Sequence, residues 1–311
     1  MKPFIRSLIF FLIPIIGLSL SLEYYLRNRI NTNEILAKLE LVHRHSDTEL
    51  IFIGNSHGRN SFNPDDFELK SLNLCIGGST PFYNSELLEK VIDDFPNLKY
   101  IVYNISYQSL FYDMDRLPDE KKKYEFLHYL GSDCGVDKNR HEYYSILSTV
   151  GLRNAIDNVI VDLTQSSEKW IEHRGFKSES GKIDLDDVRE AAHIRIDAHH
   201  QLMSDDKKTF NFNQLSQTEK IAEEHSVKII YVALPVIEAY ANLMESPFVG
   251  FRKEMNEFVN SRGSSFIDLS IDPQLDLADF VDPDHVNIEG AQKLSDFLSD
   301  RLDSLKNAIK K

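Results

Sequence analysis

The chain has 311 residues, of which 42% are hydrophobic, and this is enough to bury one sizeable core or a core with a small subdomain. Charged residues make up 27% of the sequence, and glycine and proline are few, so global disorder and collagen-like repeats are excluded. The 49 acidic residues outnumber the 35 basic ones and leave no basic stripe of the kind that duplex binders carry, so no nucleic-acid partner is expected.

The N-terminal segment predicts a membrane anchor over residues 1–30. Residues 7–22 (SLIFFLIPIIGLSLSL) carry no charge. The segment is terminal and apolar on all faces, which favours a membrane helix over a buried core helix. No small-x-small cleavage motif follows it, so the sequence predicts an uncleaved signal anchor with Tyr24 and Tyr25 at the interface.

Basic residues flank the apolar segment on both sides, so the positive-inside rule does not decide its orientation. A short N-terminal tail is easily left in the cytoplasm. We therefore expect a single pass through the inner (cytoplasmic) membrane, with the globular body outside, in the periplasm. There Cys75 and Cys134 could form one disulfide; two separate buried thiols are an equal alternative.

Beyond the anchor, residues 31–47 predict a linker helix, with aliphatic side chains at helical spacing. Short apolar runs then predict five buried strands, at residues 49–54, 72–76, 99–105, 228–234 and 265–269. Helices are predicted at residues 83–94, 249–261 and 288–307. Strands separated by helices indicate βαβ units, and therefore an α/β domain of residues 48–311 with a parallel sheet covered on both faces.

The segment 107–226 lies between the third and fourth predicted strands and is far too long for an ordinary crossover. We interpret it as a mostly helical insertion over the C-terminal edge of the sheet. Insertions at that edge usually shape the substrate site.

Two short motifs lie at opposite ends of the domain and can contribute to one site. Gly54-Asn55-Ser56-His57 directly follows the first strand. Ligands of open parallel sheets bind beyond the carboxyl ends of the strands, so Ser56 has the position of a nucleophile. Asp282-Pro283-Asp284-His285 lets a carboxylate reach an imidazole and fix its tautomer. Each motif alone could instead be a capped turn.

Two further residues could bind an oxyanion. Gly78 follows the second strand, and its backbone N–H would lie beside the end of the first strand. Asn104 ends the third strand and offers a side-chain amide. All these elements fall at the carboxyl ends of predicted strands or in the terminal loop, so one site is a better interpretation than independent accidents.

In order and spacing these blocks resemble the SGNH (GDSL-like) hydrolase superfamily. Gly54-Asn55-Ser56 is similar to the family's Gly-Asp-Ser, residues 73–78 to its Asn-x-Gly-x-x-Gly, and Asp282-x-x-His285 to its last block. Asn55 stands where the family has aspartate, and Cys75 where its second block has the first glycine. The third block, around Asn104, lacks the family's final aspartate because Ile105 follows.

The resemblance implies a fold and a set of roles. The fold is a flavodoxin-like three-layer α/β/α sandwich with a mainly parallel five-stranded sheet. Ser56 would be the nucleophile, His285 its base and Asp282 the carboxylate that orients His285. The oxyanion hole would consist of Ser56, Gly78 and Asn104.

The anchor, the long insertion and the closing Asp-x-x-His-x-Asn-x-x-Gly-Ala also resemble the membrane-anchored branch of the superfamily. That branch includes alginate O-acetylation proteins and the D-alanine transfer protein, which act with membrane-bound O-acyltransferases. The resemblance covers residues 48–108 and 226–305. It implies as partners a cell-envelope polysaccharide or an acyl donor, a membrane-bound O-acyltransferase, and the membrane itself through the N-terminal helix.

Other side chains compete for these roles. His57 could replace His285 as the base, and Asp284 could replace Asp282 as its orienter. A sequence neighbour of the nucleophile rarely reaches the required geometry, and the i−3 carboxylate matches the motif, so His285 and Asp282 are preferred. His199-His200 has no metal-motif spacing, and we interpret it as a solvated or substrate-facing pair.

The sequence therefore predicts an extracytoplasmic serine esterase or O-acyltransferase that uses a Ser-His-Asp triad and an acyl-enzyme, with no metal or organic cofactor required. The alternative is a catalytically weak scaffold that presents a polymer to a membrane-bound O-acyltransferase; the long insertion and the altered third block favour it. Hydrolysis and transfer share one nucleophile, so the residues leave both open.

Overall fold

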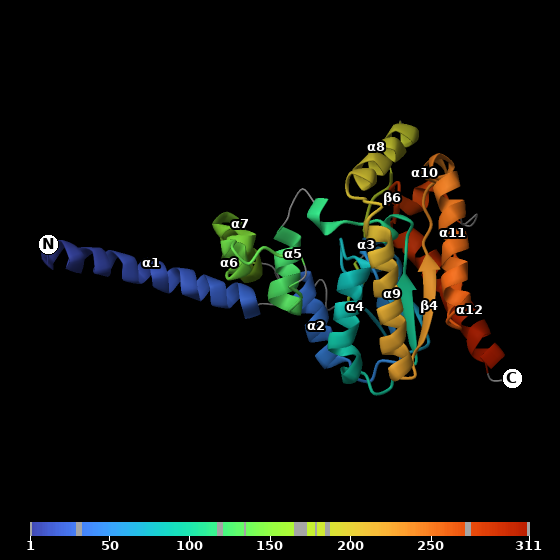
Figure 1. The fold of residues 1–311 in the computed structure, drawn as a ribbon, viewed down its shortest axis with the longest axis horizontal. Coiled ribbons are helices and arrows are strands. Elements are labelled where there is room, and N and C mark those ends of the chain that lie inside the picture. The colour runs from blue at the N-terminus through green and yellow to red at the C-terminus, as the bar shows by residue number, and fades with distance from the viewer. Residues whose placement is uncertain are drawn as a thin grey trace. The chain divides into compact units, whose positions relative to one another are not determined.

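The computed structural model describes residues 2–28, 33–116, 121–133, 135–164, 173–177, 179–183, 187–270 and 275–309 (Figure 1). The chain forms two compact units. One consists of Met1–Ala37 and Pro118–Glu168, and the other of Lys38–Leu117 and Lys169–Lys311. Cys134 lies outside the described residues, so a bridge between Cys75 and Cys134 stays a prediction.

The elements follow one another in this order. The helices are α1 (Lys2–Asn28), α2 (Glu34–Arg44), α3 (Ser56–Ser61), α4 (Pro81–Val91), α5 (Lys121–Glu125), α6 (Ile146–Val150), α7 (Leu152–Thr164), α8 (Val188–Gln201), α9 (Lys207–Glu224), α10 (Glu238–Leu243), α11 (Glu245–Asn260) and α12 (Ile288–Ile309). The strands are β1 (Leu50–Ile53), β2 (Ser71–Asn73), β3 (Tyr100–Asn104), β4 (Lys228–Ala233), β5 (Ser265–Asp268), β6 (Phe280–Asp282) and β7 (His285–Val286). Short 3-10 or π turns lie at Pro64–Asp66, Ile92–Asp94, Gln108–Leu110, Met114–Arg116, Phe126–Leu130, His141–Tyr143 and Leu277–Asp279.

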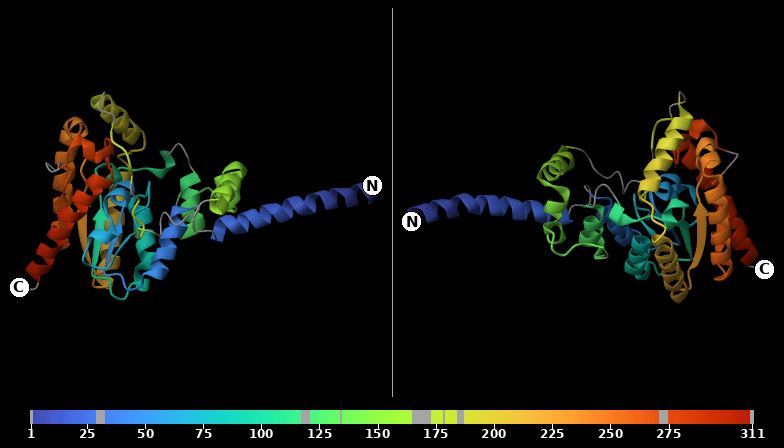
Figure 2. Two further views of the ribbon diagram at one scale, coloured as in Figure 1. Left: turned by 180° about the vertical axis from the view of Figure 1, so that it is seen from behind. Right: turned by 45° about the horizontal axis from the view of Figure 1, so that its top comes forward.

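The second unit is built on a five-stranded parallel sheet with the strand order β2-β1-β3-β4-β5. This is the order of the flavodoxin-like doubly wound fold. Each strand comes from one of the five predicted apolar runs, and β1 is buried along its whole length because helices cover both faces of the sheet. The predicted α/β/α architecture is confirmed (Figures 1 and 2).

One face of the sheet carries α4, α9 and α11. Tyr103 of β3 and Tyr231 of β4 have ring centroids 5.3 Å apart, and Phe258 of α11 packs on Tyr231 at 5.8 Å. Asn84 of α4 donates a hydrogen bond to the Tyr103 hydroxyl over 3.0 Å. Phe212 of α9 contacts Phe258. The aromatic side chains of the strands thus join the three helices into one layer.

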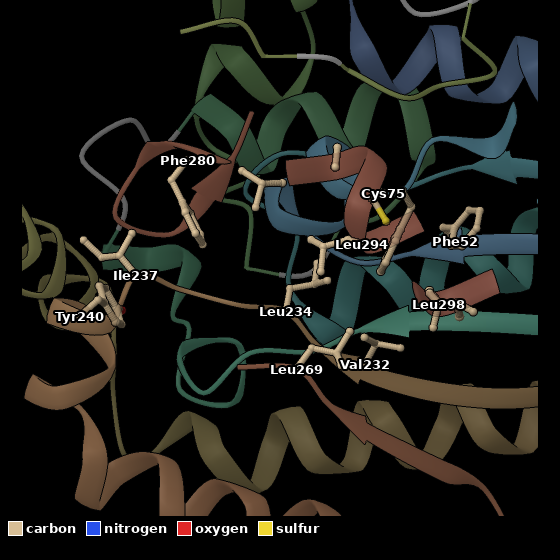
Figure 3. Packing of buried hydrophobic residues seen from close by; sticks show 14 of the residues in the cluster. Phe52, Cys75, Val232, Leu234, Ile237, Tyr240, Leu269, Phe280, Leu294 and Leu298 are labelled. Carbon is tan, nitrogen blue, oxygen red and sulfur yellow. The ribbon is translucent and has the colours of Figure 1, made fainter. Parts of the chain in front are cut away.

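The opposite face carries α3 and α12 over the main hydrophobic core. Phe52 of β1 stacks on Phe62 beyond the end of α3, with ring centroids 4.8 Å apart. Leu294 and Leu298 of α12 belong to the same buried cluster as Phe52 and Val232 (Figure 3). The strands β6 and β7 form the terminal hairpin, which α12 follows. Because α12 packs with α3, which follows β1, the two ends of this unit lie together.

The first unit contains the predicted N-terminal apolar helix. Within α1, the stretch Pro3–Asn28 is long and apolar enough to cross a membrane, and only 6% of its most apolar window is buried. A membrane anchor and a signal sequence both have these properties. The predicted linker helix corresponds to α2, whose first residues belong to this unit and whose later residues belong to the other.

The segment 107–226 is mostly helical in its described parts and is divided between the two units. Residues 118–168, with α5, α6 and α7, belong to the first unit. In the second unit, α8 lies beyond the tips of the parallel strands (Figure 1), while α9 covers a face of the sheet as a crossover helix does. Within the described part of this segment, α8 and the turn Gln108–Leu110, whose Ser109 Oγ accepts a hydrogen bond from Asn55 Nδ2 over 3.2 Å, lie at the edge expected for the insertion.

Asn287 offers a test of how the terminal hairpin is fixed to the fold. Its fully buried side chain donates to the carbonyls of Gly181 (3.0 Å) and Ala278 (2.7 Å) and accepts from the Gly290 N–H (3.0 Å). We expect Asn287→Ala to lower the free energy of unfolding by about 3 kcal/mol, because it leaves buried backbone groups without partners. Urea unfolding of the full chain, followed by circular dichroism, measures this change.

The matched control is Asn256→Ala, which truncates an exposed asparagine of α11. We expect it to change the free energy of unfolding by less than about 0.5 kcal/mol. Equal effects of the two substitutions would contradict the structural role of Asn287.

Candidate active site

Ser56 lies at the first residue of α3, immediately after the turn that ends β1. Gly54 makes this turn with φ +150°, and a Cβ there would lie 2.7 Å from the Asn104 Cβ, so only glycine fits. Asn55 caps α3 by accepting a hydrogen bond from the His57 N–H over 3.0 Å. The Ser56 side chain is consequently held, half-buried, at the carboxyl edge of the sheet.

Asp282 and His285 face one another across a two-residue hairpin. They pair between the antiparallel strands β6 and β7, with Pro283 and Asp284 in the turn. The Asp282 Oδ1 accepts hydrogen bonds from the backbone N–H of Asp284 (3.0 Å) and of His285 (2.8 Å). These hydrogen bonds within the turn hold the carboxylate beside the imidazole.

The fold joins this hairpin to Ser56. His285 Nε2 lies 2.8 Å from Ser56 Oγ, although the two residues are 229 positions apart in the chain. His285 Nδ1 lies 2.9 Å from Asp282 Oδ2. A carboxylate only accepts hydrogen bonds, so Nδ1–H donates to Asp282 in the neutral imidazole, and Nε2 is then the acceptor for the Ser56 hydroxyl.

A second carboxylate, Asp284, lies fully buried behind this chain. His57 Nε2 donates to Asp284 Oδ2 over 2.9 Å, and Arg195 Nε donates to Asp284 Oδ1 over 2.6 Å. Asp284 Oδ1 also lies 3.4 Å from His285 Nδ1, farther than Asp282. Asp282 is therefore the closer orienter, as preferred from the sequence, and His57 binds Asp284 rather than serving Ser56.

Arg195 and His199 are the members of this cluster that the sequence did not reveal. Both come from α8, four residues apart and thus on one helix face. Arg195 Nη2 lies 3.3 Å from His285 Nδ1, and the buried His199 has Nε2 3.3 Å from Asp284 and Nδ1 2.9 Å from the Tyr240 hydroxyl. The interpretation of His199 as solvated or substrate-facing was wrong, because Tyr240 and Asp284 bind it in the interior.

The cluster contains side chains that can bind a metal ion, but their contacts are those of an ion-pair network. Ligand atoms of His57, Asp284 and His285 lie within 4.8 Å of one another, close enough to surround a cation. However, the guanidinium of Arg195 already neutralises Asp284, and the imidazole nitrogens point at Asp284, Asp282 and Ser56. A divalent ion would have to displace a fixed positive charge, so we assign no metal to these residues.

Burial and charge divide the imidazoles of the cluster into two groups. Burial lowers the pKa of His57, and it lowers the pKa of His199 to about 4, against the opposing charge of Asp284. Burial also disfavours the imidazolium of His285, but hydrogen bonds and charge from Asp282 and Asp284 outweigh it and raise its pKa to about 9. At neutral pH, His285 is therefore the protonated imidazole of the three.

Asp284 provides the compensating negative charge. Burial alone would raise the pKa of this carboxyl, but its contacts with His57 and His285 hold the pKa well below the usual range. Burial also lowers the pKa of Arg195, but the charge of Asp284 and its hydrogen bond with the guanidinium outweigh this effect and raise that pKa. A carboxylate and a guanidinium thus form a fixed pair directly behind His285.

The three predicted oxyanion donors have different surroundings. Asn104 is buried, its Oδ1 accepts from the Gly58 N–H (3.2 Å), and its Nδ2 donates to the Val232 carbonyl (3.4 Å). It holds β3 to α3 and β4, and its role as an oxyanion donor stays a prediction. Gly78 lies in a half-exposed turn with φ +71°, and its role stays a prediction. Among the described residues, the Ser56 N–H has no backbone or side-chain acceptor.

Comparison with known proteins gives similarities of fold only. Neither a protein-family model nor a curated protein matches the sequence. A solved protein assigned as an acylhydrolase of Bacteroides fragilis aligns over 83% of this chain and 88% of its own, with 11% identity and a TM-score of 0.42. One assigned as a platelet activating factor of Streptococcus pneumonia aligns over 93% and 99%, with 12% identity and a TM-score of 0.41. A GDSL-like lipase of Bacteroides thetaiotaomicron aligns over 88% and 99%, with 10% identity and a TM-score of 0.43. The function is therefore inferred from the residues of the site.

Proposed function

We propose that the protein is a membrane-anchored serine enzyme of the SGNH type that hydrolyses or transfers acyl esters. The observation that carries this proposal is the unbroken hydrogen-bonded chain from Ser56 Oγ through His285 to Asp282, with distances of 2.8 Å and 2.9 Å. A nucleophile, a base and an orienting carboxylate in this geometry are the mark of acyl-transfer enzymes on many unrelated folds.

In the proposed reaction, Ser56 Oγ forms a bond to the acyl carbonyl carbon as its proton passes to His285 Nε2. The electron pair of the carbonyl bond moves to oxygen, where the backbone N–H groups of Ser56 and Gly78 stabilise it. Collapse of this intermediate breaks the ester bond, and His285 returns the proton to the leaving oxygen. Water or a sugar hydroxyl then attacks the acyl carbonyl carbon as its proton passes to His285 Nε2. The bond between the acyl carbon and Ser56 Oγ breaks, and His285 returns the proton to Oγ.

We infer that the acyl group belongs to a cell-envelope polysaccharide or a related glycan. The support is the N-terminal helix α1, which is exposed along its apolar length, together with the sequence resemblance to the membrane-anchored branch. In this proposal α1 crosses the inner membrane once, the body lies in the periplasm, and a membrane-bound O-acyltransferase is the partner. The proposed acyl transfer uses only chemical groups of this chain and of its substrates.

A second candidate function is a scaffold that presents the polymer to the acyltransferase. The raised pKa of His285, about 9, favours it, because an imidazolium cannot accept the proton of Ser56 at neutral pH. The intact contact between Ser56 and His285 opposes it.

Covalent labelling tests the nucleophile. We expect a fluorophosphonate to label the purified full chain once, and Ser56→Ala to abolish the label, because among the described residues Ser56 is the serine whose hydroxyl contacts His285. Asp282→Asn should slow labelling by about 10³-fold or more, since His285 then loses the carboxylate that fixes its tautomer. Intact-protein mass spectrometry measures both.

Ser180→Ala is the control for labelling, because it removes an exposed hydroxyl of the same unit. It should label at the wild-type rate. Retention of the label in a folded Ser56→Ala variant would remove Ser56 from the proposed role.

The pH dependence of labelling tests the charge of His285. Only the neutral imidazole accepts the Ser56 proton, so a folded-state pKa of about 9 predicts a rate that rises with pH and levels off above that value. Asp284→Asn removes one of the charges that stabilise the imidazolium. Its midpoint should therefore fall by about one pH unit or more.

Rate constants for fluorophosphonate labelling between pH 6 and 10 (roughly the range that brackets a shifted imidazole) give both midpoints. Equal midpoints near the ordinary histidine value in the wild type and in Asp284→Asn would contradict the assigned role of Asp284.

Polymer acylation in cells separates the enzyme from the scaffold. If the chain is the enzyme, cells that carry Ser56→Ala should lose nearly all of the envelope acylation that depends on this protein. Quantification of acyl groups on the purified polymer, at equal amounts of wild-type and variant protein, measures this. Equal acylation with both would favour the scaffold.

A further inference from the structure

Helix α7 of the first unit has a row of exposed aliphatic side chains along one side. This aliphatic stripe consists of Leu152, Ile156, Ile160 and Leu163, whose exposed fractions are 60%, 46%, 52% and 78%. At about 100° per residue these four positions fall within an arc of about 80°. Ala155, on the neighbouring arc, is fully buried against the unit. A surface helix normally turns its apolar face inward, so this exposed stripe needs a partner.

The surface of α7 away from the stripe is mainly polar, with Val161 as an exposed aliphatic residue among the polar ones. Arg153 and Asp157 are exposed and lie one turn apart, with 4.0 Å between Nε and Oδ2, and Asn154 is exposed beside them. The helix therefore has three sides, of which one packs on its own unit, one is mainly polar, and one is aliphatic and uncovered. This is the pattern of a helix that lies in a membrane–water interface.

The burial of α1 indicates where that interface lies. Residues 3–21 are exposed, which is a length of about 29 Å at the helical rise and matches the hydrocarbon thickness of a bilayer. Burial begins at Leu22 and is complete at Leu26. The hydrocarbon region should therefore end close to Glu23.

The segment that leads into α7 is attached to α1 at this level. The Glu23 carboxylate accepts hydrogen bonds from the Ser145 hydroxyl (2.8 Å) and from the N–H groups of Ile146 (3.1 Å) and Leu147 (2.9 Å), where α6 begins. Gly151 then joins α6 directly to α7. The start of α7 is thereby fixed relative to the end of the exposed part of α1.

Two further contacts hold α7 and its neighbourhood there. The Tyr25 hydroxyl donates a hydrogen bond to the carboxylate of Asp162 on α7, and Arg27 Nη2 donates to the Tyr144 carbonyl over 3.1 Å. Tyr24 and Tyr144 have largely exposed rings at this level. Exposed tyrosines beside the end of an apolar helix are typical of the headgroup region.

We propose that α7 lies in the headgroup region of the same membrane that α1 crosses, with Leu152, Ile156, Ile160 and Leu163 in contact with acyl chains. The proposal rests on the membrane anchoring inferred above. Lipid is favoured over a protein because the stripe is attached, within one compact unit, to the end of an apolar helix that itself needs lipid.

The charge of α7 and of the whole chain indicates how the helix would bind the membrane. Arg153, Asp157 and Asp162 leave α7 with no net positive charge, and the chain as a whole has a net charge of −14. Apolar burial rather than attraction to anionic lipid would hold the helix. Vesicles of zwitterionic phosphatidylcholine should therefore suffice, with little dependence on salt.

Tryptophan scanning of the full chain in phosphatidylcholine vesicles tests the proposal. The sequence has one tryptophan, Trp170, which is replaced by phenylalanine. Single tryptophans are then introduced by Ile160→Trp on the stripe, Asn154→Trp on the polar side and Ile13→Trp within α1. We expect lipids labelled near the headgroup to quench Ile160→Trp, and aqueous iodide to quench Asn154→Trp at least about threefold more efficiently than Ile160→Trp.

Each outcome has a defined meaning. Quenching of Ile13→Trp by deeply labelled lipid, with equal iodide access at positions 160 and 154, would overturn the interfacial role of α7 and leave the anchor intact. No lipid quenching at position 13 would overturn the anchor and this proposal together. Shielding at position 160 that appears only at high protein-to-lipid ratio would assign the stripe to a second copy of the chain. The labelling of Ser56 is independent of all three results.

Discussion

The hydrogen bond between Ser56 and His285 depends on one structural constraint, the packing of the terminal hairpin against the end of the first strand. A parallel sheet brings the carboxyl ends of its strands to one edge, which places Ser56 there, but it does not place the hairpin. The hairpin is held by Asn287, which closes the start of α12, and by the packing of α12 over the same core as β1. The 2.8 Å contact is therefore a product of the whole hydrophobic layer on that face and not of the motif alone.

A buried charge imposes the second constraint on the site. An isolated carboxylate at the position of Asp284 would be strongly destabilising, and Arg195 with the surrounding imidazoles compensates it. The same charge stabilises the imidazolium of His285. In the proposed acyl transfer that stabilisation would lower the energy of the charged intermediate, but it acts equally on the resting state, where a protonated His285 is no base. The charge that holds the site rigid therefore also raises the pH at which His285 can act as the base.

The sequence predicts best what depends on local pattern. The five strands follow from short apolar runs, and the contact between Asp282 and His285 follows from their spacing around a two-residue turn. The surroundings of Asn104 could not be predicted, because its position at a strand end says nothing about the direction of its side chain, which the adjacent Gly58 N–H and Val232 carbonyl determine. Arg195 could not be found, because its partner Asp284 lies 89 residues away and no periodic pattern joins them.

The insertion illustrates why segment boundaries read from a sequence do not give physical units. The segment 107–226 is continuous in the chain, yet residues 118–168 fold with α1 and the later part folds with the sheet. The first part presents an aliphatic stripe beside the apolar helix, and the second supplies Arg195 and a crossover helix. The described residues in contact with Ser56, His285 and Asp284 belong to the second unit, so the proposed chemistry and the proposed membrane contact have separate structural bases. A single insertion serves both because each half buries its apolar side chains with the neighbours that complete its own core.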